Sequence, residues 1–128
     1  MAVADTREAA LASLMMSLAS GAKHLAQVTT NGKQIPPDLE PKFREVMGRY
    51  RFDQHQVPGG PNVRLIEELG LVEYLADRMT IAGTPDDCMA QIARAQAAGA
   101  HQFCTMVAFP DKMAFMRRWS ESVIASFA

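Results

Sequence analysis

The spacing of apolar residues along the chain predicts a protein that is mostly helical. Residues 6–20 are rich in Ala, Leu and Met, which favour helix, and Asp5 three residues before Glu8 is typical of a capping box at a helix start. Residues 39–52 carry apolar side chains at i, i+3, i+4 and i+7, which predicts a second helix. Residues 63–76 predict one helix or two short ones, interrupted at a glycine.

A loop-rich insertion is expected over residues 28–62. Asn31-Gly32 is a turn signal, and the prolines and glycines at 36–37 and 58–61 mark further loops around the helix predicted there. Loop-rich stretches of this length inside a domain are usually functional. His55, which follows the aromatic pair Tyr50 and Phe52, could line the mouth of a pocket, and the alternative is a histidine on a solvent-exposed loop.

A βαβ unit is expected over residues 78–109. Residues 78–82 have the apolar and β-branched character of a short strand, Gly83 allows a tight turn, and Thr84 is a good N-cap for a helix that runs to about residue 98. Residues 103–109 are almost continuously apolar, which is typical of a strand buried on both faces. We therefore expect Met79–Ala82 and Phe103–Phe109 to lie side by side as parallel strands.

The remaining segments complete an α/β pattern. Ala2-Val3-Ala4 could form a short strand, and residues 111–127 predict a terminal helix with Asp111 as its N-cap. Strands are too few for a complete sheet, so residues 1–128 are expected to be a single partial domain, helix-rich and with parallel strands.

Four segments, in order along the chain, resemble one family. Residues 3–9 read VADTREA, residues 50–55 YRFDQH, residues 81–88 IAGTPDDC and residues 97–103 AAGAHQF. Together they resemble the carboxyl-terminal part of the luciferase-like superfamily of flavin- and deazaflavin-dependent monooxygenases, which includes bacterial luciferase.

This resemblance implies a TIM barrel, (β/α)8, of which the chain would supply about the last two to three β/α units. It also implies an oxidoreductase that acts on paired donors with molecular oxygen, using FMN or a deazaflavin coenzyme, and a small-molecule substrate. Most cofactor-binding residues are expected outside this chain, and no catalytic residue can be carried over. Gly83 and Thr84 would lie at the carboxyl end of a barrel strand and could border the pocket, or they could simply cap a helix.

Two functional interpretations follow. In the first, the chain is part of such an enzyme and contributes barrel closure together with a complementary barrel-forming chain or a second copy. In the second, it is a non-catalytic small α/β assembly or binding module that forms oligomers through its methionine-rich helices, since it carries nine methionines.

Composition narrows these possibilities. A net charge of −1 argues against nucleic-acid binding, because phosphate contacts require an excess of Lys and Arg. The apolar stretch at residues 9–16 is too short to cross a membrane, and the start lacks the layout of a secretory signal, so a cytoplasmic protein is expected.

Candidate chemistry in the sequence is sparse. Cys88 and Cys104 are expected to be reduced, buried and inert, and three histidines without ligand spacing predict no metal site. There is no Gly-x-Ser-x-Gly motif, and the serines cluster in the two terminal helical regions, so the sequence does not favour nucleophilic catalysis.

Overall fold

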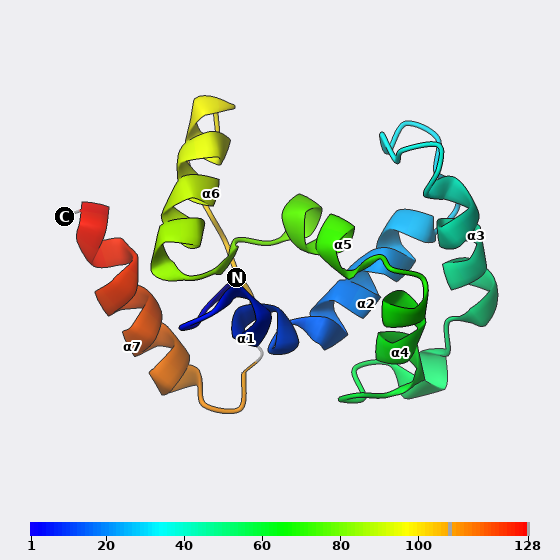
Figure 1. Ribbon diagram of the computed structural model, residues 1–128, viewed down its shortest axis with the longest axis horizontal. Coiled ribbons are helices and arrows are strands. Elements are labelled where there is room, and N and C mark those ends of the chain that lie inside the picture. The colour runs from blue at the N-terminus through cyan, green and yellow to red at the C-terminus, as the bar shows by residue number, and fades with distance from the viewer. Residues whose placement is uncertain (108, 128) are drawn as a thin grey trace. The chain divides into compact units, whose positions relative to one another are not determined.

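The computed structural model describes residues 1–107 and 109–127 and is helix-rich, with two short parallel strands in that part of the chain (Figure 1). The elements, in chain order, are β1 (Ala2–Val3), α1 (Arg7–Ala12), α2 (Met15–Ala26), α3 (Glu40–Arg49), the 3₁₀ helix η1 (Phe52–Gln54), α4 (Pro61–Glu68), α5 (Val72–Met79), β2 (Ala82–Gly83), α6 (Pro85–Ala97), α7 (Lys112–Ser122) and the 3₁₀ helix η2 (Ile124–Phe127).

The residues expected to form one partial domain fall into two compact units. The first comprises Met1–Leu14 and Thr80–Ala128, and the second comprises Met15–Met79. Both strands belong to the first unit, whereas α2 to α5 make up the second. The predicted loop-rich insertion, residues 28–62, lies wholly in the second unit, where it contains α3 and η1.

The first unit is built around the pairing of β1 with β2. The strands are parallel, with Ala2 opposite Ala82 and Val3 opposite Gly83. The Ala2 N–H donates to the Ile81 carbonyl at 3.0 Å, so the hydrogen bonds of β2 toward β1 come from residues 81 and 83. The α/β class with parallel strands is therefore present, although the sheet is very small.

Side chains from β1, from the residue before β2, from α6 and from the carboxyl end of α7 form the core of this unit. The buried cluster consists of Val3, Ile81, Cys88, Ile92 and Val123, with Trp119 packed against it. Trp119 thus anchors α7, as its size and its place in the helix suggest.

The second unit is a small helical bundle in which α2 packs against α3, α4 and α5. Its largest buried side chains are Leu18, Phe43, Val46, Ile66, Leu71 and Leu75. A Cβ placed on Gly21 of α2 would lie 2.6 Å from the Met79 Sδ, so the absence of a side chain there lets α5 approach α2 closely.

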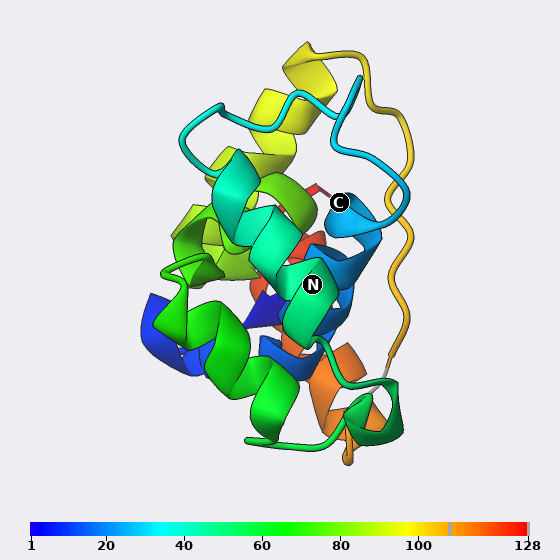
Figure 2. The ribbon, with the colours of Figure 1, turned by 90° about the vertical axis from the view of Figure 1, so that its right-hand side faces the viewer.

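The predicted pairing of Met79–Ala82 with Phe103–Phe109 is wrong for the residues that the structure describes. Helix α5 extends through Met79, which leaves a strand of only Ala82–Gly83. Residues 101–107 form neither helix nor strand, and Figure 2 shows them as an extended trace; Ala108 lies outside the described residues. The physical reason is that a side chain from α6 already binds the edge of β2 that faces away from β1.

Helix boundaries in the first half of the chain also differ from expectation. The predicted helix over 6–20 is divided into α1 and α2, because the Ser13 hydroxyl donates to the Ala10 carbonyl at 2.6 Å and the Leu14 N–H turns back to the Leu11 carbonyl. Its N-cap is Thr6, one residue after Asp5.

The second half of the chain follows its predicted helix pattern more closely. Helix α6 begins after the Thr84 cap, and helix α7 begins after Asp111, whose carboxylate accepts the Ala114 N–H at 2.8 Å. The helix expected over 63–76 forms as α4 and α5, with the break at Gly70.

Candidate functional site

The glycine–threonine corner lies at the carboxyl end of β2, in the first unit. Thr84 is the N-cap of α6: its hydroxyl accepts the Asp87 N–H at 3.2 Å, and the Asp87 carboxylate accepts the Thr84 N–H at 2.9 Å. These reciprocal bonds form a complete capping box. The hydrogen bond from the Thr84 amide, followed by that from its hydroxyl, lowers the pKa of Asp87, so the carboxylate stays charged where the helix dipole favours it.

Gly83 is required by this cap. Its φ of +142° lies in a region that residues with a side chain rarely adopt, and an added Cβ would lie 2.5 Å from the Asp87 Oδ2. The amides of Thr84 and Asp87 are both engaged by the cap, so an anion at this corner would first have to displace the Asp87 carboxylate. The described arrangement is that of a helix start and does not fit the phosphate group of a cofactor.

The outer edge of β2 is closed by a side chain from α6. The Gln91 Oε1 accepts the Ala82 N–H at 3.2 Å, and its Nε2 donates to the Ala82 carbonyl at 2.9 Å. The Arg7 guanidinium also donates to that carbonyl at 3.3 Å. A carboxamide presents an acceptor oxygen and two N–H donors, so Gln91 can bind both the N–H and the carbonyl of Ala82 and occupies the place of a neighbouring strand there.

The cysteine at this corner, Cys88, does not offer an activated thiol. Cys88 is fully buried, and burial, followed by the neighbouring Asp87 charge, raises the pKa of its thiol to about 11, which keeps it protonated and unreactive. Cys104 is exposed, so the prediction that it is buried is wrong. It lies in the segment 101–107, which forms no strand.

A cavity of about 430 Å³ lies in the first unit beside the same segment. Ile92, Phe103, Trp119 and Phe127 are among its apolar lining residues. Gly83 and Thr84 are not among them, so this cavity is separate from the corner.

His55 lies in the second unit, where it makes two side-chain contacts. Its Nδ1 is 2.6 Å from the Tyr50 hydroxyl oxygen, and its Nε2 is 3.4 Å from the Ser20 Oγ. Tyr50 is only 8% exposed, whereas His55 is exposed. The imidazole is therefore held from its buried side by a phenol and lies next to a serine hydroxyl on its other side.

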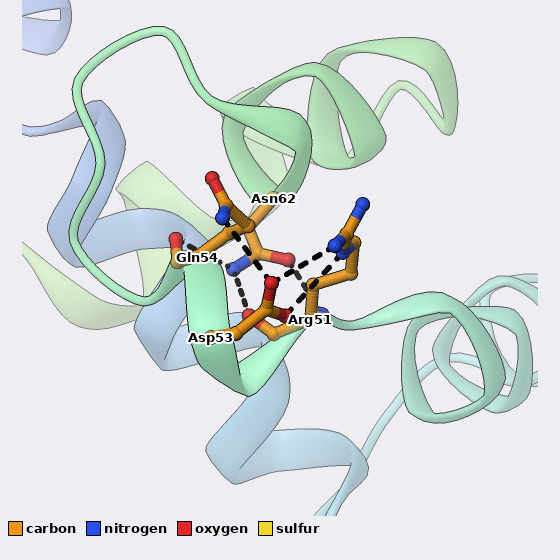
Figure 3. A network of polar contacts seen from close by, with 4 residues as sticks. All are labelled: Arg51, Asp53, Gln54 and Asn62. Carbon is orange, nitrogen blue, oxygen red and sulfur yellow. Dashed lines mark hydrogen bonds and ion pairs between the residues drawn. The ribbon is translucent and has the colours of Figure 1, made fainter.

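The turn that carries His55 is fixed by a buried amide, shown in Figure 3. The Asn62 Oδ1 accepts the Arg51 N–H at 2.8 Å, and its Nδ2 donates to the carbonyls of Arg51 at 2.8 Å and Gln54 at 3.1 Å. Asn62 is 4% exposed, so these bonds are shielded from water. Arg51 also binds the Asp53 carboxylate at 2.9 Å and lowers the pKa of that carboxyl group.

The same turn covers one face of α2. The Lys23 Nζ lies 5.0 Å from the centroid of the Phe52 ring, a cation–π contact, and that ring makes a T-shaped contact with the Tyr50 ring at 5.5 Å between centroids. Ser20 and Lys23 are three residues apart on α2, and Phe52 and His55 are three apart on the turn. The two pairs meet in antiparallel order, Ser20 with His55 and Lys23 with Phe52.

The three residues predicted to line a pocket thus belong to separate units: His55 to the second, Gly83 and Thr84 to the first. Sequence reasoning missed Ser20 and Asn62 as partners of the His55 turn. The spacing of Ser20 and Lys23 indicates that the two side chains share one face of a helix. No local pattern indicates that this face pairs with a turn thirty-five residues along the chain.

The described residues contain no group of three or more His, Cys, Asp or Glu side chains that could hold a metal ion. In the same part of the chain, no helix combines the length and the apolar character that crossing a membrane requires. Comparisons of the chain with models of protein families, with curated proteins and with solved structures found no match.

Proposed function

We propose that this chain is the closing segment of a luciferase-like (β/α)8 barrel and contributes to an oxidoreductase that uses reduced FMN or a deazaflavin coenzyme. The observation that carries the proposal is the parallel pairing of residues 2–3 with residues 82–83, across a long connection, followed at once by a glycine–threonine corner and a capped helix. This is the order expected for two neighbouring barrel strands and the helix after the second.

The contribution of the chain is to the barrel wall and to the rim of a substrate pocket. When the cofactor is bound, it supplies electrons for the activation of oxygen or a hydride for the substrate. The amides at the Thr84 corner are already occupied by the capping box, so the groups that hold the cofactor belong to other parts of the barrel. No step of the reaction is assigned to a residue of this chain.

The segment 101–107 has the role of the last barrel strand in this proposal. It contains Phe103, Met106 and Val107, and the Met106 side chain is 83% exposed. An apolar segment becomes a strand when a neighbouring strand pairs with it, and in a closed barrel both of its edges are paired. Docking beside β2 would displace the Gln91 carboxamide from Ala82, and the far edge of the docked strand would need a strand from the complementary part of the barrel.

The direct test is to find the complementary part. We expect the reading frame upstream of Met1, or a neighbouring gene, to encode about two hundred residues with alternating strand and helix patterns. Co-expression of that product with this chain should give a stable complex that binds reduced FMN or deazaflavin, with slowed amide exchange at residues 103–107. A complex that binds neither cofactor would contradict the proposed function.

A second function, that of a non-catalytic assembly module, is supported by exposed apolar side chains at the end of the chain. Met113 is 64% exposed, Met116 48%, Ile124 53% and Phe127 52%, and all four lie on α7 or η2. In this case the isolated chain should sediment as a stable dimer or larger oligomer. The double variant M113K/M116K should then dissociate it, whereas the same variant would not prevent assembly through β2.

A further inference from the structure

We propose that Ser20 is a nucleophile activated by His55, and that the face of the second unit formed by α2 and residues 50–55 cleaves small, activated carboxylic esters. This inference needs only the contacts within the second unit and does not rest on the barrel assignment.

The geometry has the three parts that an activated serine requires. The nucleophile and the base are adjacent, with the Ser20 Oγ 3.4 Å from the His55 Nε2, a separation that shortens in many enzymes when substrate binds. The base is oriented by a third group, because the His55 Nδ1 lies 2.6 Å from the Tyr50 oxygen. The proposed tautomer has the proton on Nδ1, where it is donated to Tyr50, and leaves the Nε2 lone pair facing Ser20.

The positions of these groups are held by the fold. The Tyr50 N–H donates to the Val46 carbonyl at the end of α3, and the Tyr50 side chain is buried. The Asn62 carboxamide binds the backbone of Arg51, just before η1, and of Gln54, the last residue of η1, which fixes the turn between Tyr50 and His55. Ser20 lies in the regular helix α2. A nucleophile and a base on fixed elements are preorganised, so little reorganisation precedes attack.

The neighbouring side chains define the substrate class. The Phe52 ring is 67% exposed and offers an apolar surface to an acyl or leaving group. Lys23 lies one helical turn beyond Ser20, with its ammonium 5.0 Å from the centroid of the Phe52 ring, and in this proposal the ammonium turns from that ring to face the negative charge that develops on a carbonyl oxygen. The backbone N–H groups around Ser20 are those of a helix, so no backbone oxyanion hole is formed and Lys23 takes that role alone. The activity expected is therefore slow and limited to esters with good leaving groups.

The proposed reaction balances without a cofactor. The Ser20 Oγ attacks the acyl carbon and its proton passes to the His55 Nε2, so an Oγ–C bond forms. The bond from the acyl carbon to the leaving oxygen then breaks, and that oxygen takes the proton from Nε2. Water hydrolyses the acyl-serine by the same route in reverse. The products are one carboxylic acid and one alcohol.

The experiment is covalent labelling of the full chain with an alkyl fluorophosphonate, which traps activated serines by forming an Oγ–P bond and releasing fluoride. Intact-mass and peptide mass spectrometry should find one adduct, on Ser20. We expect H55Q to slow labelling about a hundredfold, because the general base is removed, and S20A to abolish it. The matched control is S17A, which changes an exposed serine of the same helix and should label at the rate of the original chain. Hydrolysis of p-nitrophenyl butyrate should follow the same ranking.

Tyr50 orients His55 in this proposal. Its test therefore measures a property that would not change if Tyr50 had only a structural role. Nitrogen NMR of the His55 imidazole should show the Nδ1–H tautomer in the original chain, and Y50F should lose that preference while its circular dichroism is unchanged. The proposal is overturned by an Nε2–H tautomer in the original chain. It is equally overturned if labelling is absent, falls on other serines or is unaffected by H55Q. Each of these results would leave the contacts of His55 with the purely structural role of docking the turn on α2.

Discussion

Each unit of the molecule uses a side-chain amide to bind the N–H and the carbonyl of one backbone residue, and the two cases differ in what the amide achieves. In the first unit, Gln91 binds the N–H and the carbonyl of Ala82. In the second unit, Asn62 binds the N–H and the carbonyl of Arg51 in the same way. Both amides satisfy backbone groups that have no neighbour in a sheet.

The surroundings explain the difference. Asn62 is the buried polar side chain of the described core, and its third hydrogen bond, to the Gln54 carbonyl, reaches across η1. Gln91 is half-buried, and its third bond returns to the Asp87 carbonyl of its own helix. Asn62 thus builds a turn that displays His55, whereas Gln91 closes the outer edge of β2. The comparison shows that the same group can join two separate backbone segments or tie a strand edge to its own helix, depending on what its third bond reaches.

The largest effect should come from replacing the buried amide. Asn62→Ala leaves the Arg51 N–H and carbonyl without partners in a shielded site, so we expect a loss of about 3 kcal/mol in the free energy of unfolding, measured by urea denaturation. Asn31→Ala, in an exposed loop of the same unit, is the control and should change stability by about 0.5 kcal/mol at most. Equal effects for the two variants would show that Asn62 does not hold the turn.

Replacement of the second amide should cost less. Gln91→Ala removes the contacts with Ala82, but this site is half-buried and Arg7 still donates to the Ala82 carbonyl. We expect a loss of about 1.5 kcal/mol in the free energy of unfolding. Gln96→Ala, at an exposed position of the same helix, provides the matched control and should be nearly neutral. A loss as large as that of Asn62→Ala would remove the distinction between the two amides.

Loss of a helix cap should have a somewhat smaller effect, and it too can be compared within the chain. Thr84→Ala removes the hydroxyl that caps the thirteen-residue helix α6, and we expect a loss of about 1 kcal/mol. Thr6→Ala removes the corresponding hydroxyl from α1, which has only six residues, and should have the smaller effect on thermal unfolding. The reverse order would indicate that the capping box does not stabilise the corner.

The smallest effect is on the dependence of stability on pH. The pKa of Asp87 is lowered first by the hydrogen bond from the Thr84 amide, and the pKa of Asp53 is lowered first by the hydrogen bond from Arg51. A lowered pKa in the folded state stabilises the protein above the ordinary carboxyl value of about 3.9, and this stabilisation is lost as the pH falls through the lowered value.

Asp87→Asn and Asp53→Asn should therefore each flatten the fall in melting temperature below about pH 4. Added salt should weaken the contribution of Asp53 to stability, because the side chains of Arg51 and Asp53 are 58% and 61% exposed. The contribution of Asp87 should stay nearly unchanged, because its hydrogen-bond donor is a backbone amide. A salt response of the same size for both carboxylates would contradict the view that an exposed ion pair stabilises Asp53 and a backbone hydrogen bond stabilises Asp87.

The sequence predicted well those features that depend on neighbours in the chain. The Gly83-Thr84-Pro85 corner, the Asp111 cap and the break at Gly70 were all found where the residue types indicated them. Each depends on the φ that glycine allows or on a side chain that binds an amide three residues away. Even the one-residue error at the first cap, Thr6 in place of Asp5, is a choice between two adjacent good capping residues.

The errors fall where contacts between distant residues decide the outcome. Residues 103–107 have a strand's composition, yet Gln91 holds the edge that they were expected to pair with. The candidate site shows the same dependence. His55 was singled out in the sequence, but its partners Tyr50 and Ser20 follow from the docking of the turn on α2.

The sequence by itself therefore determined most of the helices, most of their caps and the small α/β character of the chain, because these arise from propensities and hydrogen bonds over three or four residues. Tertiary structure alone decided which backbone edge was free, which polar groups met and which apolar segment stayed without a partner. These outcomes depend on competition among side chains far apart in the chain, where one carboxamide can replace a strand and where no local pattern shows which of them will bind.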